Sequence, residues 1–376
     1  MREVLADVLN WCRSGRGCAT ATVVATFRSA PRLPGAAMAV SADGVAVGSV
    51  SGGCVEGAVY ELAQEVIGSG VPVLERYGVS DDDAFAVGLT CGGIIDVLVE
   101  PVPAGRLAEL EAINEAVAGQ RPVASATIIS GPRPIGTRIL IGPDTVTGSL
   151  GSIGLDVAVI DDARGMLEQG MTDVRRYGAD GERRRDDLAV FVQSFAPPPR
   201  LLVFGAIDFA AAVASIGTFL GYQVTVCDAR PVFATSKRLP HAAEVVVAWP
   251  HTYLAAEVSA GRIDDRTVVC VLTHDPKFDV PLLEVALRTP AAYIGAMGSR
   301  RTHDDRLAKL RELGLAEAEL DRLASPIGLD LGARTPAETA VSVAAEIIAL
   351  RRGGSGRRLA DAQGRIHGAP ARESVG

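Results

Sequence analysis

The feature that most constrains this chain is a repeat within its first half. Residues 48–78 align without a gap with residues 148–178, and upstream the pair Pro31-Arg32 recurs as Pro132-Arg133. The positions that recur unchanged are Gly48, Ser49, Ala58, Val59, Ala63, Gly70, Arg76, Tyr77 and Gly78. The period is far longer than that of a solenoid, so it predicts two fused copies of one supersecondary unit.

The two copies differ where chemistry is expected. Gly52-Gly53-Cys54 of the first copy becomes Ser152-Ile153-Gly154 in the second, and Thr90-Cys91-Gly92-Gly93 has no counterpart. We interpret residues kept in both copies as scaffold. Residues found only in the first copy are therefore the better functional candidates.

Paired glycines flank both cysteines of the first copy. Gly52 and Gly53 precede Cys54, and Gly92 and Gly93 follow Cys91. Glycine pairs let backbone N–H groups turn toward an anion, and thiolates are ligands for soft metals. The two cysteines are therefore candidate metal ligands and the four glycines candidate cofactor-binding residues.

Cys54 also has a second interpretation. It precedes a predicted helix, whose dipole favours the thiolate, but a free cysteine at such a place often packs as a small hydrophobe. Glu56 and Arg32 are weaker candidates for cofactor binding, because Asp156 and Arg133 match them in the second copy.

Composition and charge exclude several classes of protein. The chain has 376 residues and a net charge of −8, which argues against a general nucleic-acid or anionic-membrane surface. No apolar run reaches the ~20 residues that span a bilayer, and charges at Arg2 and Glu3 come too early for a secretory signal. The six cysteines are too few for a disulfide scaffold, so we expect a cytoplasmic protein with reduced thiols.

Consecutive prolines in residues 196–200 mark the clearest domain boundary. Before it we expect a duplicated domain over residues 1–196, with copies at 1–103 and 104–196. After it, short apolar runs alternate with helical stretches over residues 200–352, which predicts a doubly wound parallel sheet of the Rossmann type. Residues 353–376 are rich in Gly, Arg and Ser, and we expect a flexible tail. The predicted fold class is α/β.

The second half carries an altered dinucleotide-binding fingerprint. A strand leads into Gly205, and Asp228 ends the next strand, where a ribose-binding carboxylate belongs. Ile207 replaces the central glycine that lets the backbone approach a pyrophosphate, so ordinary NAD(P) binding is not expected. Gly205, Asp208 and Asp228 remain candidate cofactor contacts, and an NAD(P)-dependent oxidoreductase remains the alternative function.

Later loops of this half add polar candidates. Arg230 follows Asp228, Asp275 follows a strand, and Ser299-Arg300 precedes a helix. Ligands of open α/β sheets lie at the carboxyl ends of strands, and arginines near a helix start suit a phosphate. Asp275 and Ser299 have the alternative role of helix caps. No residue set is predicted to be catalytic.

Together these motifs resemble the XdhC/CoxI family of xanthine dehydrogenase accessory proteins. The similarity rests on long segments that cover nearly all of the chain up to about residue 350. They are Ala30-Pro31-Arg32, Ser51-Gly52-Gly53-Cys54-Val55-Glu56, Leu89-Thr90-Cys91-Gly92-Gly93, Phe204-Gly205-Ala206, Asp228-Ala229-Arg230, Thr273-His274-Asp275, Gly295-Ala296-Met297-Gly298-Ser299-Arg300 and Ser325-Pro326-Ile327-Gly328-Leu329-Asp330.

The resemblance implies a molybdenum-cofactor chaperone rather than an enzyme. Family members are expected to bind the molybdopterin-type cofactor, in a mononucleotide or dinucleotide form, and to assist its sulfuration. They deliver it to xanthine-dehydrogenase or CO-dehydrogenase-type hydroxylases. The implied partners are the hydroxylase apo-enzyme and a sulfur donor of the cysteine-desulfurase type, with no nucleic acid and no membrane. We also expect a homodimer.

Overall fold

The computed structural model describes residues 1–27, 32–78, 93–273 and 275–361. These residues fall into two compact units, which divide between Pro197 and Pro198. The predicted tail over residues 353–376 lies mostly outside the described residues. Each unit is described by itself below.

The first unit contains the same series of elements twice. The first series is α1 (Leu5–Arg13), β1 (Cys18–Phe27), β2 (Ala37–Ser41), β3 (Ala46–Gly48), α2 (Glu56–Ser69), β4 (Val73–Tyr77) and β5 (Ile94–Pro101). After the short 3₁₀ turn η1 (Ala104–Arg106), the second series is α3 (Leu107–Ala118), β6 (Val123–Ser130), β7 (Arg138–Ile141), β8 (Val146–Gly148), α4 (Ile153–Glu168), β9 (Asp173–Tyr177) and β10 (Leu188–Phe195).

The two sheets of this unit have the same topology. Their strand orders are β3-β2-β1-β5-β4 and β8-β7-β6-β10-β9, and all neighbours are antiparallel. The register even slips at equivalent places, where Val24 of β1 and Ile129 of β6 are left without a paired residue. The predicted internal duplication is therefore confirmed.

A recurring glycine illustrates what both copies must keep. Gly48 and Gly148 adopt φ of 79° and 96°, a region that favours glycine. A Cβ at Gly148 would lie 2.7 Å from the backbone oxygen of Arg138, and one at Gly48 would collide with that of Ala37. Their recurrence reflects strand pairing rather than ligand binding.

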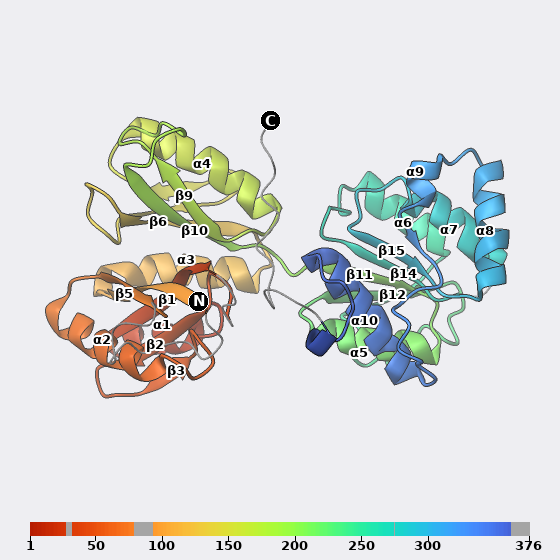
Figure 1. Ribbon diagram of the computed structural model, residues 1–376, viewed down its shortest axis with the longest axis horizontal. Helices are drawn as coiled ribbons and strands as arrows, with labels where there is room; N and C mark the ends of the chain where they lie inside the picture. The colour runs from red at the N-terminus through yellow and green to blue at the C-terminus, as the bar shows by residue number, and fades with distance from the viewer. Residues whose placement is uncertain (28–31, 79–92, 274, 362–376) are drawn as a thin grey trace. The chain divides into compact units, whose positions relative to one another are not determined.

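Each sheet is covered on one face by its own helix. α2 packs on the first sheet around Val59 and Ala63, and α4 packs on the second around Val159 and Ala163. The other faces approach each other, where Val24, Leu98, Ile129, Ala189 and Phe191 form a shared core. α1 and α3 pack together in the same unit, as Figure 1 shows.

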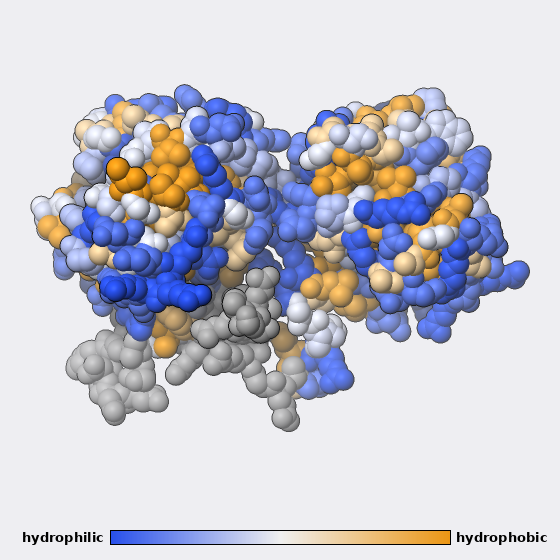
Figure 2. Space-filling view, turned by 90° about the horizontal axis from the view of Figure 1, so that it is seen from above, coloured by the Kyte–Doolittle hydropathy of each residue, from blue (hydrophilic) through white to orange (hydrophobic). Residues whose placement is uncertain are grey.

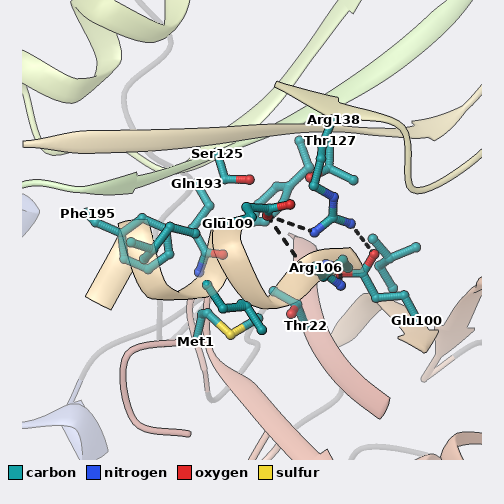
Figure 3. A pocket seen from close by; sticks show the side chains of 14 residues that line it. Met1, Thr22, Glu100, Arg106, Glu109, Ser125, Thr127, Arg138, Gln193 and Phe195 are labelled. Carbon is teal, nitrogen blue, oxygen red and sulfur yellow. Dashed lines mark hydrogen bonds and ion pairs between the residues drawn. The ribbon is translucent and has the colours of Figure 1, made fainter. Parts of the chain in front are cut away.

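A largely buried cluster of four charged side chains links the two copies (Figure 3). Arg138 on β7 points toward Glu100 on β5 and toward Glu109 on α3, and Arg106 pairs with Glu100 at 3.1 Å. Burial raises the pKa of Glu100, but the two guanidinium groups outweigh it and hold that pKa below its usual value. Gln193 on β10 occupies the equivalent place in the second sheet, because Glu100 pairs with Thr20 as Gln193 pairs with Ser125.

The second unit is a parallel sheet with helices on both faces. Its elements are β11 (Arg200–Phe204), α5 (Asp208–Phe219), β12 (Gln223–Asp228), β13 (Glu244–Val247), α6 (Pro250–Ser259), β14 (Val268–Val271), α7 (Pro276–Ala286), β15 (Tyr293–Ala296), α8 (Arg300–Glu312), α9 (Glu317–Leu320), β16 (Leu323–Ala324), α10 (Pro336–Arg352) and the 3₁₀ turn η2 (Leu359–Asp361).

The strand order is β13-β12-β11-β14-β15-β16, with every pair parallel. This is the doubly wound Rossmann order, so the predicted fold class is confirmed. α5 and α10 cover one face, around Val213 and Val343, while α6 and α7 cover the other, around Leu254 and Leu282. The carboxyl ends of all strands therefore meet at one edge of the sheet.

Hydrophilic residues occupy most of the face shown in Figure 2, with apolar residues gathered in smaller patches. Among the described helices, none combines the length and the apolar character needed to cross a bilayer.

Candidate functional site

The loop that carries Cys54 differs in structure between the copies. Glu56 aligns with Asp156, yet α2 begins at Glu56 whereas α4 begins at Ile153. The three residues that form the first part of α4 correspond to Gly53, Cys54 and Val55, which lie outside the helix in the first copy. The helix of the first copy thus begins three residues later than the helix of the second.

Hydrogen-bond donors of residues 49–53, the loop that carries Cys54, surround the carboxylate of Glu56. It accepts hydrogen bonds from the backbone N–H groups of Val50 (3.2 Å), Ser51 (2.9 Å), Gly52 (3.0 Å) and Gly53 (2.8 Å). The hydroxyls of Ser49 and Ser51 donate to it at 2.7 and 2.5 Å. The N–H groups that the sequence suggested for an external anion therefore face the chain's own carboxylate.

These hydrogen bonds change the acidity of Glu56. Burial raises its pKa, but the hydroxyls of Ser51 and Ser49, together with backbone N–H groups, outweigh burial and lower that pKa to about 2. The carboxylate is therefore ionised at any physiological pH. It acts as a permanent internal anion that holds the loop in one conformation.

The second copy has a weaker version of this arrangement. Asp156 accepts from the Leu150 N–H at 2.7 Å and from the Ser149 hydroxyl at 2.7 Å. Ser152 caps α4 by accepting from the Leu155 N–H at 3.3 Å. A normal N-cap thus replaces the carboxylate-filled loop where the glycines and the cysteine are missing.

Cys54 sits on this loop with its side chain half-buried. It packs partly against the core beneath α2, which includes Val55 and Val59, and it keeps some exposure. The Ser51 hydroxyl accepts from the Cys54 N–H at 2.9 Å while it donates to Glu56. Glu56 therefore fixes the Cys54 backbone through a single intermediate side chain.

The glycines beside Cys54 leave open space. Gly52 and Gly53 have φ of 80° and 120°, and among the described residues, apart from their chain neighbours, no atom lies within 4 Å of the place where either Cβ would stand. A ligand can therefore approach this backbone closely, as the sequence suggested. Cys91 and Gly92 lie outside the described residues, and Gly93 is buried directly before β5. The expected proximity of Cys54 and Cys91 stays a prediction.

The ion pair that Arg32 forms does not involve the Cys54 loop. Its guanidinium pairs with Glu3 at 2.6 Å. In the part of the chain that the structure describes, no group of three or more His, Cys, Asp or Glu side chains could hold a metal ion. A purely protein-made metal centre is therefore not found among those residues.

The altered fingerprint of the second unit is shaped by packing. Gly205 has φ of 108°, and a Cβ there would lie 2.9 Å from the Thr273 side chain and 3.1 Å from the Thr273 nitrogen. Ile207 packs against the core at the start of α5 and lines an open hollow of about 240 Å³. Asp208 is exposed and pairs with Arg238 at 3.3 Å beside the same hollow.

Three of the predicted residues come together at the carboxyl edge of the sheet. Asp228 is buried and accepts from the Ala206 N–H at 2.7 Å, and its oxygens accept from the Arg230 guanidinium at 2.9 and 2.8 Å. The pKa of Arg230 is raised, first by these hydrogen bonds and also by the nearby charge of Asp275. The carboxylate that a ribose would need is therefore already engaged.

The other two predicted residues are on the surface of α8. Ser299 caps the helix by accepting from the Thr302 N–H at 3.1 Å, and Arg300 is exposed at its first position. Asp275 likewise caps α7 by accepting from the Lys277 N–H at 3.0 Å. The capping alternative is thus present at both positions.

The second unit also contains a buried ion pair, between Arg306 and Asp279, that the sequence did not predict. Arg306 on α8 donates to Asp279 on α7 at 2.7 Å, and both side chains are 3% exposed. Arg306 also donates to Ser325 at 3.1 Å and to the Met297 oxygen at 3.1 Å, while Thr273 donates to Asp279. This cluster joins the loops after β14 and β15 to the segment after β16.

Comparisons with known proteins agree with this architecture. Residues 201–347 match the model described as the XdhC Rossmann domain. Residues 11–78 and 116–178 match the XdhC and CoxI family, once in each copy of the duplicated unit. The two models together cover more than half of the chain.

Two curated relatives match this chain along most of their own length. The chain is 28% identical over 352 residues to the molybdenum cofactor insertion chaperone PaoD of Escherichia coli K12, covering 93% of this chain and 88% of PaoD. It is 27% identical over 338 residues to a probable xanthine dehydrogenase component of Bacillus subtilis 168, covering 88% and 92%. A crystal structure from Bacillus halodurans, described as a xanthine dehydrogenase, has the same fold, with a TM-score of 0.69, 24% identity, and coverage of 95% and 98%.

Proposed function

The chain belongs to the XdhC and CoxI family, and we propose that it is a chaperone that carries the molybdenum cofactor to molybdenum hydroxylases. Its cargo is the molybdopterin-type cofactor, and its client is an apo-enzyme of the xanthine-dehydrogenase or CO-dehydrogenase type. It also assists sulfuration of the cofactor before insertion. Similarity to PaoD over 93% of the chain supports cofactor insertion as the activity.

One observation in the structure carries this proposal. In the first copy a glycine loop holds Cys54 outside the helix, whereas the equivalent residues of the second copy lie within the helix. An ordinary scaffold gives no reason for this difference. A loop that offers a half-buried thiol and open backbone does give one, because a sulfur-ligated molybdenum is a soft centre.

The residues of this loop have separate roles in the proposal. Cys54 contacts the cargo, either as a ligand of molybdenum or as a carrier of sulfur, together with Cys91. Gly52 and Gly53 leave room for the pterin to approach the backbone. Glu56 is a positioning residue, since its carboxylate holds the loop through Ser51.

The second unit contributes the remaining candidates. Arg230, Asp275, Ser299 and Arg300 follow strands of the parallel sheet, so their backbone positions share one edge. We assign to this edge the phosphate or nucleotide end of the cargo. A sulfur donor of the cysteine-desulfurase type and a homodimeric assembly complete the proposal.

Two observations on the described residues argue against the alternative of an NAD(P)-dependent oxidoreductase. Asp228 is engaged by Ala206 and Arg230, and Ile207 stands where a glycine would admit the pyrophosphate. Both features argue against the usual dinucleotide pose.

A transfer assay tests the function. The chain is purified without oxygen from a host that makes the cofactor, and it is mixed with a xanthine-dehydrogenase-type apo-enzyme that lacks its cofactor. We expect the apo-enzyme to gain molybdenum and activity as the chain loses molybdenum. The same chain purified from a host unable to make the cofactor is the control. A chain that never carries molybdenum, or that does not transfer it, would contradict the proposal.

A further inference from the structure

A group of aromatic side chains is exposed beside the carboxyl edge of the second unit. Trp249 follows β13 directly before α6, and 51% of it is exposed. Its ring lies 5.1 Å from that of Phe278 on α7 at an angle of 38°, and 6.2 Å from that of His251. We call Trp249, His251 and Phe278 the aromatic platform.

The platform is held in place by the ends of the strands. The Ala248 N–H donates to the Asp228 backbone oxygen at 3.2 Å, and the Ala248 oxygen accepts from the Cys227 thiol at 3.5 Å. These bonds tie the segment before Trp249 to the end of β12. α6 and α7 pack against each other beneath the rings. The exposed face of Trp249 is therefore presented by rigid elements rather than by a long loop.

Polar groups surround the platform in a pattern that suits a phosphorylated ligand. The Lys277 ammonium lies 4.8 Å from the centre of the Phe278 ring, and the Lys277 side chain is 62% exposed. The Asp275 carboxylate lies 3.2 Å from the same ammonium. Arg230 is half-exposed but already engaged, since its guanidinium pairs with Asp228 at 2.8 Å and lies 4.6 Å from the centre of the Phe233 ring. The buried Nδ1 of His251 has no hydrogen-bond partner in the described part of the chain. The Lys277 ammonium and the Asp275 carboxylate thus border an exposed aromatic face.

From this arrangement we infer that the aromatic platform is a binding site for the base of a nucleotide. The base stacks on Trp249, because every nucleobase has a π-face that an indole can cover. The Lys277 side chain takes the phosphate, and the Asp275 carboxylate accepts from an exocyclic amino group. This site differs from the usual dinucleotide pose, since it avoids both the Gly205 turn and the engaged Asp228.

The inference rests on the proposed function in one respect, because Asp275 belongs to the edge assigned there to the nucleotide end of the cargo. A nucleotide can bind the platform whether or not the chain carries molybdenum, and the chain can carry molybdenum without it. The site also requires neither Cys54 nor any other residue of the first unit. The two ideas therefore fail in different experiments.

The two tryptophans make the test direct, because Trp11 is 7% exposed in the core of the first unit and Trp249 is half-exposed. The full chain is titrated with CMP, GMP and AMP while tryptophan emission is recorded. We expect saturable quenching with a Kd of about 0.1–1 mM, as suits one stacked base with a phosphate contact. Ribose 5-phosphate and inorganic phosphate lack a base and should not quench.

Substitutions then locate the site. Trp249→Phe should abolish the quenching, and Phe278→Ala should weaken nucleotide binding about tenfold. Lys277→Ala should weaken binding of CMP but leave that of cytidine unchanged. Phe219→Ala is the matched control, because Phe219 is another exposed aromatic residue of this unit, at the end of α5. Quenching that fails to saturate, or that survives in Trp249→Phe, would overturn the inference. A loss of nucleotide affinity in Phe219→Ala as large as that in Phe278→Ala would also overturn it.

Discussion

Replacing Glu56 with glutamine removes the charge that holds the Cys54 loop. The carboxyl pKa falls from 4.5 to about 2 on folding. Such a fall corresponds to about 3 kcal/mol of stabilisation. Gly52 and Gly53 of this loop are exposed, so solvent screening reduces the figure to about 1–2 kcal/mol. We expect Glu56→Gln to lower the free energy of unfolding of the first unit by that amount at pH 7.

The pH dependence follows from the direction of the pKa change. Because the folded-state pKa is depressed, the stabilisation is complete above the unfolded value of 4.5 and is lost as the pH falls toward 2. The difference in the free energy of unfolding between wild type and Glu56→Gln should therefore be smaller at a pH of about 3.5 than at pH 7.

Urea unfolding measures this difference in the free energy of unfolding. In a Trp249→Phe background, the remaining Trp11 reports on the first unit, because it is buried among α1 and α3. Asp156→Asn is the matched control, and its loss should be smaller because Asp156 accepts from one backbone N–H and one hydroxyl. Equal losses in the two variants, or a gap independent of pH, would refute the reasoning.

Three further predictions follow from other parts of the structure. Arg306→Met leaves Asp279 as an unpaired buried charge and should destabilise the second unit by about 3–5 kcal/mol, measured by urea unfolding through Trp249 emission. Glu100→Gln introduces the residue type of Gln193 but leaves the Arg106 and Arg138 guanidinium groups to share Glu109, so Trp11 emission should show a loss of about 3 kcal/mol. Titration calorimetry with NAD⁺ and NADPH should show no binding in the micromolar range, on the order of −8 kcal/mol, and tight binding would restore the oxidoreductase alternative.

The fold could be predicted from the sequence where the backbone itself constrains the residue. Gly48 and Gly148 recur because a side chain would collide with a neighbouring strand, so the duplication can still be recognised in the sequence. The Rossmann order followed from alternating apolar runs. β16 was missed, since it contains only Leu323 and Ala324 and no period can be read from two residues.

The site was predictable only in part. The contrast between copies singled out the Cys54 loop, and that loop is where the two copies differ in structure. The sequence could not show that Glu56 fills the loop, because a first-turn acidic residue has the same appearance when it merely favours a helix dipole. Arg306 and Asp279 lie 27 residues apart and carry no local pattern, so only the tertiary structure reveals their pairing.

The most direct test of the account is the molybdenum content of Cys54→Ala. Wild type, Cys54→Ala and the control Cys12→Ala are purified without oxygen from a host that makes the cofactor. Molybdenum and pterin per chain are measured together with the melting temperature. The account predicts that wild type and Cys12→Ala carry the cofactor, while Cys54→Ala loses most of it at an unchanged melting temperature. A Cys54→Ala protein with the wild-type content of molybdenum and pterin would contradict the assignment of this loop as the cofactor site.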